Sequence, residues 1–151
     1  MSERMAQEKG FPEPQLPRDY SWPQGHWDWP GTTRSPFKHG VKCGNMIFVG
    51  GQCALDQHGN VLHPYDIVEQ SKTVMKYIED VLAEFGATMS DVVQMNCFYV
   101  GGGSVEGWEN SFRVRAAAFP DPGPAGTAIP VPKLAYEGMM IEIQVVAMVR
   151  G

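Results

Sequence analysis

Apolar residues recur every three or four positions between residues 67 and 85, and this is the clearest pattern in the chain. They are Ile67, Val74, Met75, Ile78, Val81, Leu82 and Phe85. At roughly 100° per residue they form a stripe about 120° wide, which predicts an amphipathic helix. Asp66 and Glu69 have the spacing of a capping box at its start, and Gly86 is placed to end it.

Several other segments have the composition of strands. Met46-Ile47-Phe48-Val49 is an apolar run that ends at two glycines, and Val61-Leu62 follows a turn over residues 56–60. Residues 92–100 are rich in β-branched and aromatic side chains. Residues 127–131 and 139–148 are the last two predicted strands, and apolar and polar positions alternate in the second of them. A second helix is predicted over residues 105–119, with one face made of Trp108, Phe112, Ala116 and Phe119.

The order of these elements, β-β-α-β-α-β-β, predicts an α+β fold with two helices on one face of a mixed sheet. The other face is partly apolar through Val146 and Met148. Because an apolar sheet face needs a cover, we expect an oligomer.

Residues 1–35 differ in composition from the domain predicted over residues 36–151. Six of the twelve prolines lie between Phe11 and Pro36, and proline disfavours helix. The same segment carries aromatic residues, namely Tyr20, Trp22, Trp27 and Trp29. We expect an extended N-terminal arm that lies against a folded surface of this chain or of a partner.

The 151 residues correspond to about one domain. Twelve Lys and Arg against seventeen Asp and Glu give a net charge of −5 without a basic stripe, so no nucleic-acid partner is expected. No apolar run approaches the roughly 18 residues of a membrane span, and the N-terminus lacks the pattern of a secretory signal. We therefore expect a cytoplasmic protein with no membrane partner.

Several chemistries lack their sequence signals. The triple glycine at 101–103 is not followed by the Lys-Ser/Thr pair of a phosphate-binding loop. No metal site is expected, because ligand spacing is missing from the four histidines, His26, His39, His58 and His63. Buried free thiols in a reducing compartment are the preferred interpretation of three cysteines without a CxxC pair, Cys43, Cys53 and Cys97.

Three polar residues occupy positions with a possible chemical role. Gln52 follows two glycines at the end of a strand, where glycine allows a ligand or another backbone to approach closely. Glu142 lies in Ile-Glu-Ile; either it faces solvent from an edge strand, or it is buried at a subunit interface and suited to acid–base chemistry. Arg115 lies on the apolar stripe of the second helix, and either extends outward to solvent or points at an anionic ligand.

Several segments, taken in order, resemble the RidA/YjgF family. They are Gly44-Asn45-Met46-Ile47-Phe48-Val49-Gly50-Gly51-Gln52, the Gln70-containing helix that ends in Phe85-Gly86-Ala87, Asp91-Val92-Val93, Pro124-Ala125-Gly126-Thr127, and Leu134 followed by Ile141-Glu142-Ile143 and Ala147. The resemblance covers about residues 36 to 149, and the arm lies outside the common family core.

The resemblance implies a chorismate-mutase-like α+β fold that assembles as a homotrimer, with the sheets forming an inner barrel. It also implies three clefts between subunits. The small-molecule substrates implied are reactive enamines and imines, such as 2-aminoacrylate and 2-iminobutanoate, which are hydrolysed to 2-keto acids and ammonia. No metal or organic cofactor is implied.

The resemblance also implies a set of site residues. Glu142 matches the glutamate that positions or activates the attacking water. Gly50 stands where many members have Ser in a Ser-Gly-Gln motif. The substrate-binding positions implied for this chain are Phe37, Gly50, Gly51, Gln52, Asn110 and Thr127.

Gly126 departs from the family pattern, which has an arginine there that holds the substrate carboxylate by two hydrogen bonds. Losing such a bond costs about 1.5–3 kcal/mol, so the standard 2-imino acid deaminase activity is not expected. The missing arginine side chain also leaves room in the cleft, which would suit a larger or less acidic substrate. Arg115 and Lys38 are candidates to replace the charge, and Trp27 and Trp29 of the arm are candidates for a lid.

The leading hypothesis is a trimeric hydrolase or deaminase that acts on an enamine, imine or related activated C–N bond, with Glu142 as the catalytic residue. A non-catalytic trimer that binds a small ligand or protects proteins is the alternative. An endoribonuclease is the third hypothesis, and the net charge of −5 disfavours it.

Overall fold

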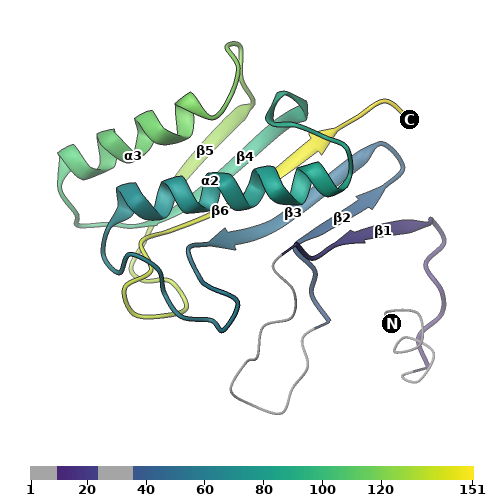
Figure 1. Ribbon diagram of the computed structural model, residues 1–151, viewed down its shortest axis with the longest axis horizontal. Coiled ribbons are helices and arrows are strands. Elements are labelled where there is room, and N and C mark those ends of the chain that lie inside the picture. The colour runs from purple at the N-terminus through teal and green to yellow at the C-terminus, as the bar shows by residue number, and fades with distance from the viewer. Residues whose placement is uncertain (1–9, 24–35) are drawn as a thin grey trace.

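Two helices lie side by side on one face of a six-stranded sheet in the computed structural model, which describes residues 10–23 and 36–151 (Figure 1). The helices are α2 (Ile67–Glu84) and α3 (Val105–Ala117). The strands are β1 (Arg18–Ser21), β2 (Gly40–Cys43), β3 (Met46–Cys53), β4 (Val92–Val100), β5 (Ala125–Val131) and β6 (Ile141–Met148), and a 3-10 turn, η1 (Met89–Asp91), precedes β4. The predicted α+β fold is confirmed, because β4 and β5 pair in parallel while the other neighbours are antiparallel.

β6 is the last strand in the chain but lies inside the sheet, whose order is β1-β2-β3-β6-β4-β5. The side chains of β6 that face the helices are buried, namely Ile141, Ile143, Val145 and Ala147. They belong to one apolar core with the buried stripe of α2, whose fully buried members are Val74, Ile78, Val81 and Leu82. Because β6 has a neighbour on each side, the interpretation of Glu142 as a residue of an edge strand is wrong.

Several elements differ from the prediction in presence or in bounds. β5 begins two residues earlier than predicted and β6 begins two residues later. β1 lies within the predicted arm and pairs with β2, from Arg18 opposite Cys43 to Ser21 opposite Gly40, so the predicted order of elements lacks one strand. β3 does not end at its two glycines but continues to Cys53. α3 ends at residue 117, two residues earlier than predicted.

α2 begins and ends where the sequence predicts. The Asp66 side chain accepts hydrogen bonds from the backbone N–H groups of Val68 and Glu69, at 3.1 and 3.0 Å. The reciprocal half of the capping box does not form, because the carboxylate of Glu69 pairs with Lys72 instead. Gly86 adopts a φ of +71°, which glycine reaches without strain.

Gln70, in the first turns of α2, connects two loop segments through a side chain that is 1% exposed. Its Nε2 donates to the carbonyl oxygens of Leu62, His63 and Gly138, at 3.2, 2.9 and 2.8 Å. Its Oε1 accepts a 2.8 Å hydrogen bond from the backbone N–H of Met140. The side chain therefore holds the loop before α2 against the loop before β6.

The sheet face opposite to the helices carries apolar side chains that are 41–44% exposed, namely Tyr20, Phe48, Ile129 and Met148. The strand register places them on the same face as Glu142 and Val146. This is the uncovered face that the alternation of β6 predicts. The expectation that other copies of the chain cover it stays a prediction.

Replacing Gln70 by Met keeps the side-chain volume but removes all four hydrogen bonds. We expect the free energy of unfolding in urea to fall by about 2–4 kcal/mol, because each buried polar group left unpaired costs about 1–3 kcal/mol. Gln57→Met, in an exposed turn, is the matched control and is expected to stay within about 0.5 kcal/mol of wild type. Equal stability of the two variants would show that the network around Gln70 contributes nothing.

Candidate functional site

Glu142 lies on β6 at the point where its pairing with β3 becomes irregular. The ladder is regular as far as Val49 and resumes at Gln52. The intervening residues Gly50 and Gly51, here called the glycine bulge, are both exposed. An irregularity of this kind bends a strand and re-aims the side chains beyond it.

The carboxylate of Glu142 occupies the space that a side chain at position 51 would need. A Cβ on Gly51 would lie 2.1 Å from Glu142 Oε1 and 2.9 Å from its Cδ. Glycine at this position therefore allows the carboxylate to lie directly against the β3 backbone. Because Glu142 is only half-buried and the bulge is exposed, a water or a small ligand can reach both.

Gln52 supports the bulge from the helix side of the sheet, where its side chain is 2% exposed. Its Oε1 lies 3.1 Å from His39 Nδ1, and its Nε2 donates to the Gly50 carbonyl at 3.0 Å. The ring of Trp22 packs edge-on against His39 at a centroid distance of 4.4 Å. Burial lowers the pKa of His39, opposed by the hydrogen bond to Gln52 and by the charge of Glu84.

Cys53 lies opposite Glu142 in the β3–β6 ladder, on the open face. Burial raises the pKa of the Cys53 thiol, and the charge and hydrogen bond of Glu142 raise it further. A raised pKa favours the protonated form of the thiol, which is less nucleophilic than the thiolate. The prediction of buried free thiols is confirmed for Cys97, whereas Cys43 and Cys53 are partly exposed.

A cavity of about 550 Å³ lies between α3 and the strands β4 and β5, and we call it the α3–β5 cavity. The aromatic and alanine face predicted for the second helix lines one side of it, with Trp108, Phe112, Ala116 and Phe119. The strands contribute Met95, Cys97, Gly126, Thr127 and Ala128. Three predicted site residues meet here, namely Arg115, Gly126 and Thr127.

Arg115 is buried in the wall of this cavity, with 3% of its surface exposed. Its Nη1 donates to Ser111 Oγ at 3.1 Å. Its guanidinium carbon lies 4.5 Å from the ring centroid of Trp108 and 5.9 Å from that of Phe112. Burial lowers the pKa of Arg115. The interpretation that Arg115 extends to solvent is wrong, because the two rings and the serine hold it inward.

Glu142 and the α3–β5 cavity lie on opposite faces of the sheet. Cys97 lines the cavity and pairs with Ile143, whose side chain is buried beneath the helices. Glu142 is the next residue along β6, so its side chain points to the other face. A single chain therefore forms two separate groups of candidate residues.

Two further predicted residues, Phe37 and Asn110, belong to neither group. Phe37 precedes β2, and its side chain is 78% exposed. Asn110 accepts a 2.8 Å hydrogen bond from Arg113 Nη1, its neighbour on α3, and does not line the α3–β5 cavity. Phe112, two residues further along the helix, does line it.

The second candidate for a substitute charge, Lys38, comes shortly after the predicted arm in the sequence, and the candidates for a lid come from the arm itself. Lys38 Nζ lies 5.4 Å from the ring centroid of Trp22, so its charge lies over an aromatic side chain. Trp27 and Trp29 fall outside the described residues.

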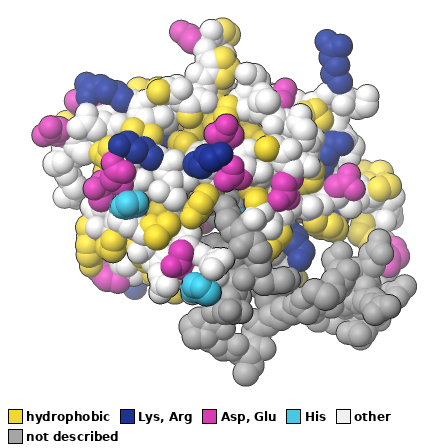
Figure 2. Space-filling model, in the orientation of Figure 1, with side chains coloured by type: hydrophobic (Ala, Val, Ile, Leu, Met, Phe, Trp, Pro, Cys, Tyr) yellow, Lys and Arg dark blue, Asp and Glu magenta, His cyan; other side chains and the backbone are white. Residues whose placement is uncertain are grey.

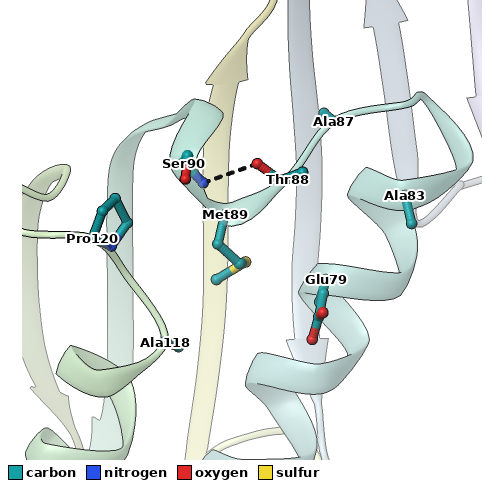
Figure 3. A pocket seen from close by; sticks show the side chains of 8 residues that line it. All are labelled: Glu79, Ala83, Ala87, Thr88, Met89, Ser90, Ala118 and Pro120. Atoms are coloured by element: carbon teal, nitrogen blue, oxygen red, sulfur yellow. Dashed lines mark hydrogen bonds between the residues drawn. The ribbon is translucent and has the colours of Figure 1, made fainter.

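A smaller cavity of about 360 Å³ lies where the end of α2 meets the turn before β4 and the segment after α3 (Figure 3). Glu79 is the one ionisable side chain among the described residues that line it. The hydroxyl of Thr88 accepts a hydrogen bond from the backbone N–H of Ser90 and caps the local turn. This cavity does not combine groups that could carry out acid–base or nucleophilic chemistry.

Acidic and basic side chains are interspersed over the helix-covered face, and no broad basic area is visible on it (Figure 2). Within residues 10–23 and 36–151, no three His, Cys, Asp or Glu side chains lie together as a metal site would require. In the same part of the chain, no helix is both long and apolar enough to cross a membrane.

The spacing of Trp108 and Phe112 in the sequence places them on an apolar face but does not assign them to the site. The signal that could have done so is Arg115 within the same aromatic stripe, because a buried guanidinium needs aromatic or hydroxyl partners. Ser111 carries no signal of its own, since its role depends on the inward rotamer of Arg115.

Comparison with known proteins points to one family. The family model described as "Endoribonuclease L-PSP" matches residues 31–149. A RutC family protein of Pyrococcus abyssi is 30% identical over 112 residues, which cover 74% of this chain and 85% of the relative. Protein mmf2, mitochondrial, of Schizosaccharomyces pombe is 31% identical over 114 residues, covering 74% and 86%. A crystal structure of a YjgF/YER057c/UK114 family member from Mycobacterium tuberculosis matches the fold with a TM-score of 0.70 at 22% identity, covering 88% of this chain and 100% of that one.

The buried His39 predicts a pH-dependent stability. Because its pKa is lowered on folding, the unfolded chain takes up a proton first as the pH falls below about 6.5. This contribution to the free energy of unfolding is therefore present above pH 6.5 and is lost as the pH falls toward the folded-state pKa. His39→Asn removes it, so the stability difference from wild type is expected to narrow between pH 7.5 and 5.5. His58→Asn, in an exposed turn, is the control, and its difference in free energy of unfolding from wild type is expected to stay constant over the same pH range. If the differences for the two variants changed with pH in the same way, the pH dependence would not come from His39.

Proposed function

Because the chain belongs to the RidA/YjgF family, whose model is described as endoribonuclease L-PSP, we propose that it is a hydrolase of an enamine, imine or related activated C–N bond in a small metabolite. The observation that carries the proposal is the carboxylate of Glu142 against Gly51. This arrangement combines a proton acceptor, exposed backbone groups and access from the open face of the sheet.

In this mechanism a water molecule between Glu142 and the glycine bulge attacks the carbon of the C=N bond. Glu142 accepts a proton from the water as the new C–O bond forms, and returns it to the nitrogen. The proton of the resulting hydroxyl group then passes to the nitrogen by way of the same carboxylate, and the C–N bond breaks as the C=O bond forms. Imine and water thereby become a carbonyl compound and ammonia. Backbone groups near Gly50 and Thr127 help to fix the ligand, and no metal or organic cofactor takes part.

Small 2-imino acids are not the proposed substrates, because Gly126 provides no side chain to hold their carboxylate. A Cβ added at Gly126 would meet no atom within 4 Å, so the position adjoins open space. Such space favours a larger substrate than those of family members that have arginine there. Phe37 and Asn110 are further proposed binding residues.

Assembly as a homotrimer is part of the proposal. The apolar residues on the open sheet face, Tyr20, Phe48, Ile129 and Met148, would be covered in such an assembly. The sheet separates Glu142 from the α3–β5 cavity within one chain, and a cleft between copies would bring Glu142 of one against Gly126 and Thr127 of another.

Two other functions have less support from the sequence and the structure. A non-catalytic ligand-binding or protein-protective trimer would keep its function without Glu142. Endoribonuclease activity, which the name of the family model suggests, is disfavoured by the net charge of −5 and would give RNA binding with a steep salt dependence. The cytoplasm remains the proposed location, because free thiols suit a reducing compartment.

The first experiment measures imine hydrolysis. An amino-acid oxidase generates imino acids of different sizes, semicarbazide traps them, and the protein competes with the trap. Wild type is expected to hydrolyse the larger imines, and Glu142→Gln is expected to lose at least about 100-fold in rate, as befits a general base. Gly126→Arg is expected to gain at least about tenfold on small 2-imino acids.

Glu109→Gln, an exposed change on α3, is the matched control and should keep the wild-type rate. An active wild type with an equally active Glu142→Gln would disprove the role of the carboxylate. Inactivity of wild type and Gly126→Arg on every imine would favour the non-catalytic alternative.

Gly51→Ala tests the position of the carboxylate. The added Cβ cannot coexist with Glu142 where it lies, so the side chain must rotate away. We expect the hydrolysis rate to fall to within about tenfold of that of Glu142→Gln, while circular dichroism shows a folded protein. A Cβ on Gly103 meets nothing within 4 Å, so Gly103→Ala should retain the rate. A fully active Gly51→Ala would mean that the carboxylate works from another position.

A further inference from the structure

The α3–β5 cavity contains a buried positive charge whose hydrogen-bonding capacity is not filled. Arg115 is 3% exposed and donates from Nη1 to Ser111 Oγ, but its buried Nε has no hydrogen-bond partner. Guanidinium has five N–H donors and stays charged at neutral pH. The site is therefore short of an acceptor.

No carboxylate of the described residues pairs with this charge. The ion pairs formed within residues 10–23 and 36–151 are Lys72–Glu69 and Lys76–Asp80, both on the surface of α2. Asp121 lines the same cavity but does not form an ion pair with Arg115. Taking a charge out of water is costly unless it is paired, and the faces of Trp108 and Phe112 offset only part of that cost. An anion would complete the site.

The walls of the cavity define what the remainder of the ligand should be. Met95, Trp108, Phe112 and Phe119 line it, so most of its surface away from Arg115 is aromatic or apolar. Its volume of about 550 Å³ falls within the range of sites for small organic ligands. The cavity is open at Gly126, because this residue of β5 has no side chain that could fill the space there.

We propose that the α3–β5 cavity binds a small carboxylic acid with an aromatic group, its carboxylate on Arg115 and its ring against Phe112 and Phe119. A carboxylate accepts two parallel hydrogen bonds from a guanidinium, and with a single charge it suits a largely apolar cavity better than a more highly charged anion does. As a statement about substrate, the inference rests on the proposed function, in which this acid is the substrate or product of hydrolysis. As a statement about binding, it stands on the cavity alone.

Isothermal titration of the full chain with phenylacetate tests the proposal. Phenylacetamide has the ring without the charge, and acetate has the charge without the ring. Wild type is expected to bind phenylacetate at least tenfold more tightly than either. Arg115→Met is expected to lose at least tenfold in affinity, and Arg115→Lys is expected to lose less. Arg113→Met changes an arginine of the same helix that pairs with Asn110 outside the cavity, and is expected to bind as wild type does.

A second variant keeps Arg115 and fills the space instead. Gly126→Leu adds a side chain where a Cβ meets no atom within 4 Å, so the fold is expected to tolerate it while phenylacetate is excluded. Absence of binding to wild type, equal binding of phenylacetamide, or full affinity in both Arg115→Met and Gly126→Leu would overturn the proposal. Phenylacetate binding by a protein that hydrolyses no imine would remove the proposed function and leave this inference standing. Glu142-dependent hydrolysis of imines by a protein that does not bind phenylacetate would support the proposed function and overturn the inference about the α3–β5 cavity.

Discussion

The burial of one face of β6 beneath α2 is the constraint on which the structure depends. Ile141, Ile143, Val145 and Ala147 are removed from water together with the apolar stripe of α2, and this burial is the main favourable contribution to folding. Since β6 lies between β3 and β4, its alternation also decides which side chains of those strands face the helices. One apolar pattern thereby sets the register of the whole sheet and directs Glu142 to the opposite face.

The glycine bulge modifies this register locally. Beyond it Gln52 faces the helices, where His39 and the Gly50 carbonyl satisfy its amide. Cys53 is then directed to the open face beside Glu142. A buried amide with two partners is stable, whereas the same amide without them would be costly, so His39 and Gln52 hold the bulge in the shape that admits the Glu142 carboxylate.

The second group of candidate residues has a different physical basis. Arg115 stays buried because Trp108, Phe112 and Ser111 surround its guanidinium, and α3 is less tightly packed on the sheet at this point, leaving the α3–β5 cavity. The sheet keeps this charge away from Glu142, so the proposed sites of proton transfer and of anion binding lie on opposite faces of one chain. This division agrees with the proposed cleft between copies of the chain.

The sequence by itself determined the α+β class, both helices, the N-cap at Asp66, the left-handed Gly86 and the alternation of β6, because each depends on neighbours within a few positions. It also singled out Glu142, Gln52 and Arg115 as polar residues in unusual places. Only the tertiary structure decided that β6 is a central strand, that β1 joins the sheet, that Arg115 turns inward, and that Glu142 lies against Gly51. Those outcomes depend on contacts between segments distant in the chain, such as residues 51 and 142, and local periodicity carries no information about which distant segments meet.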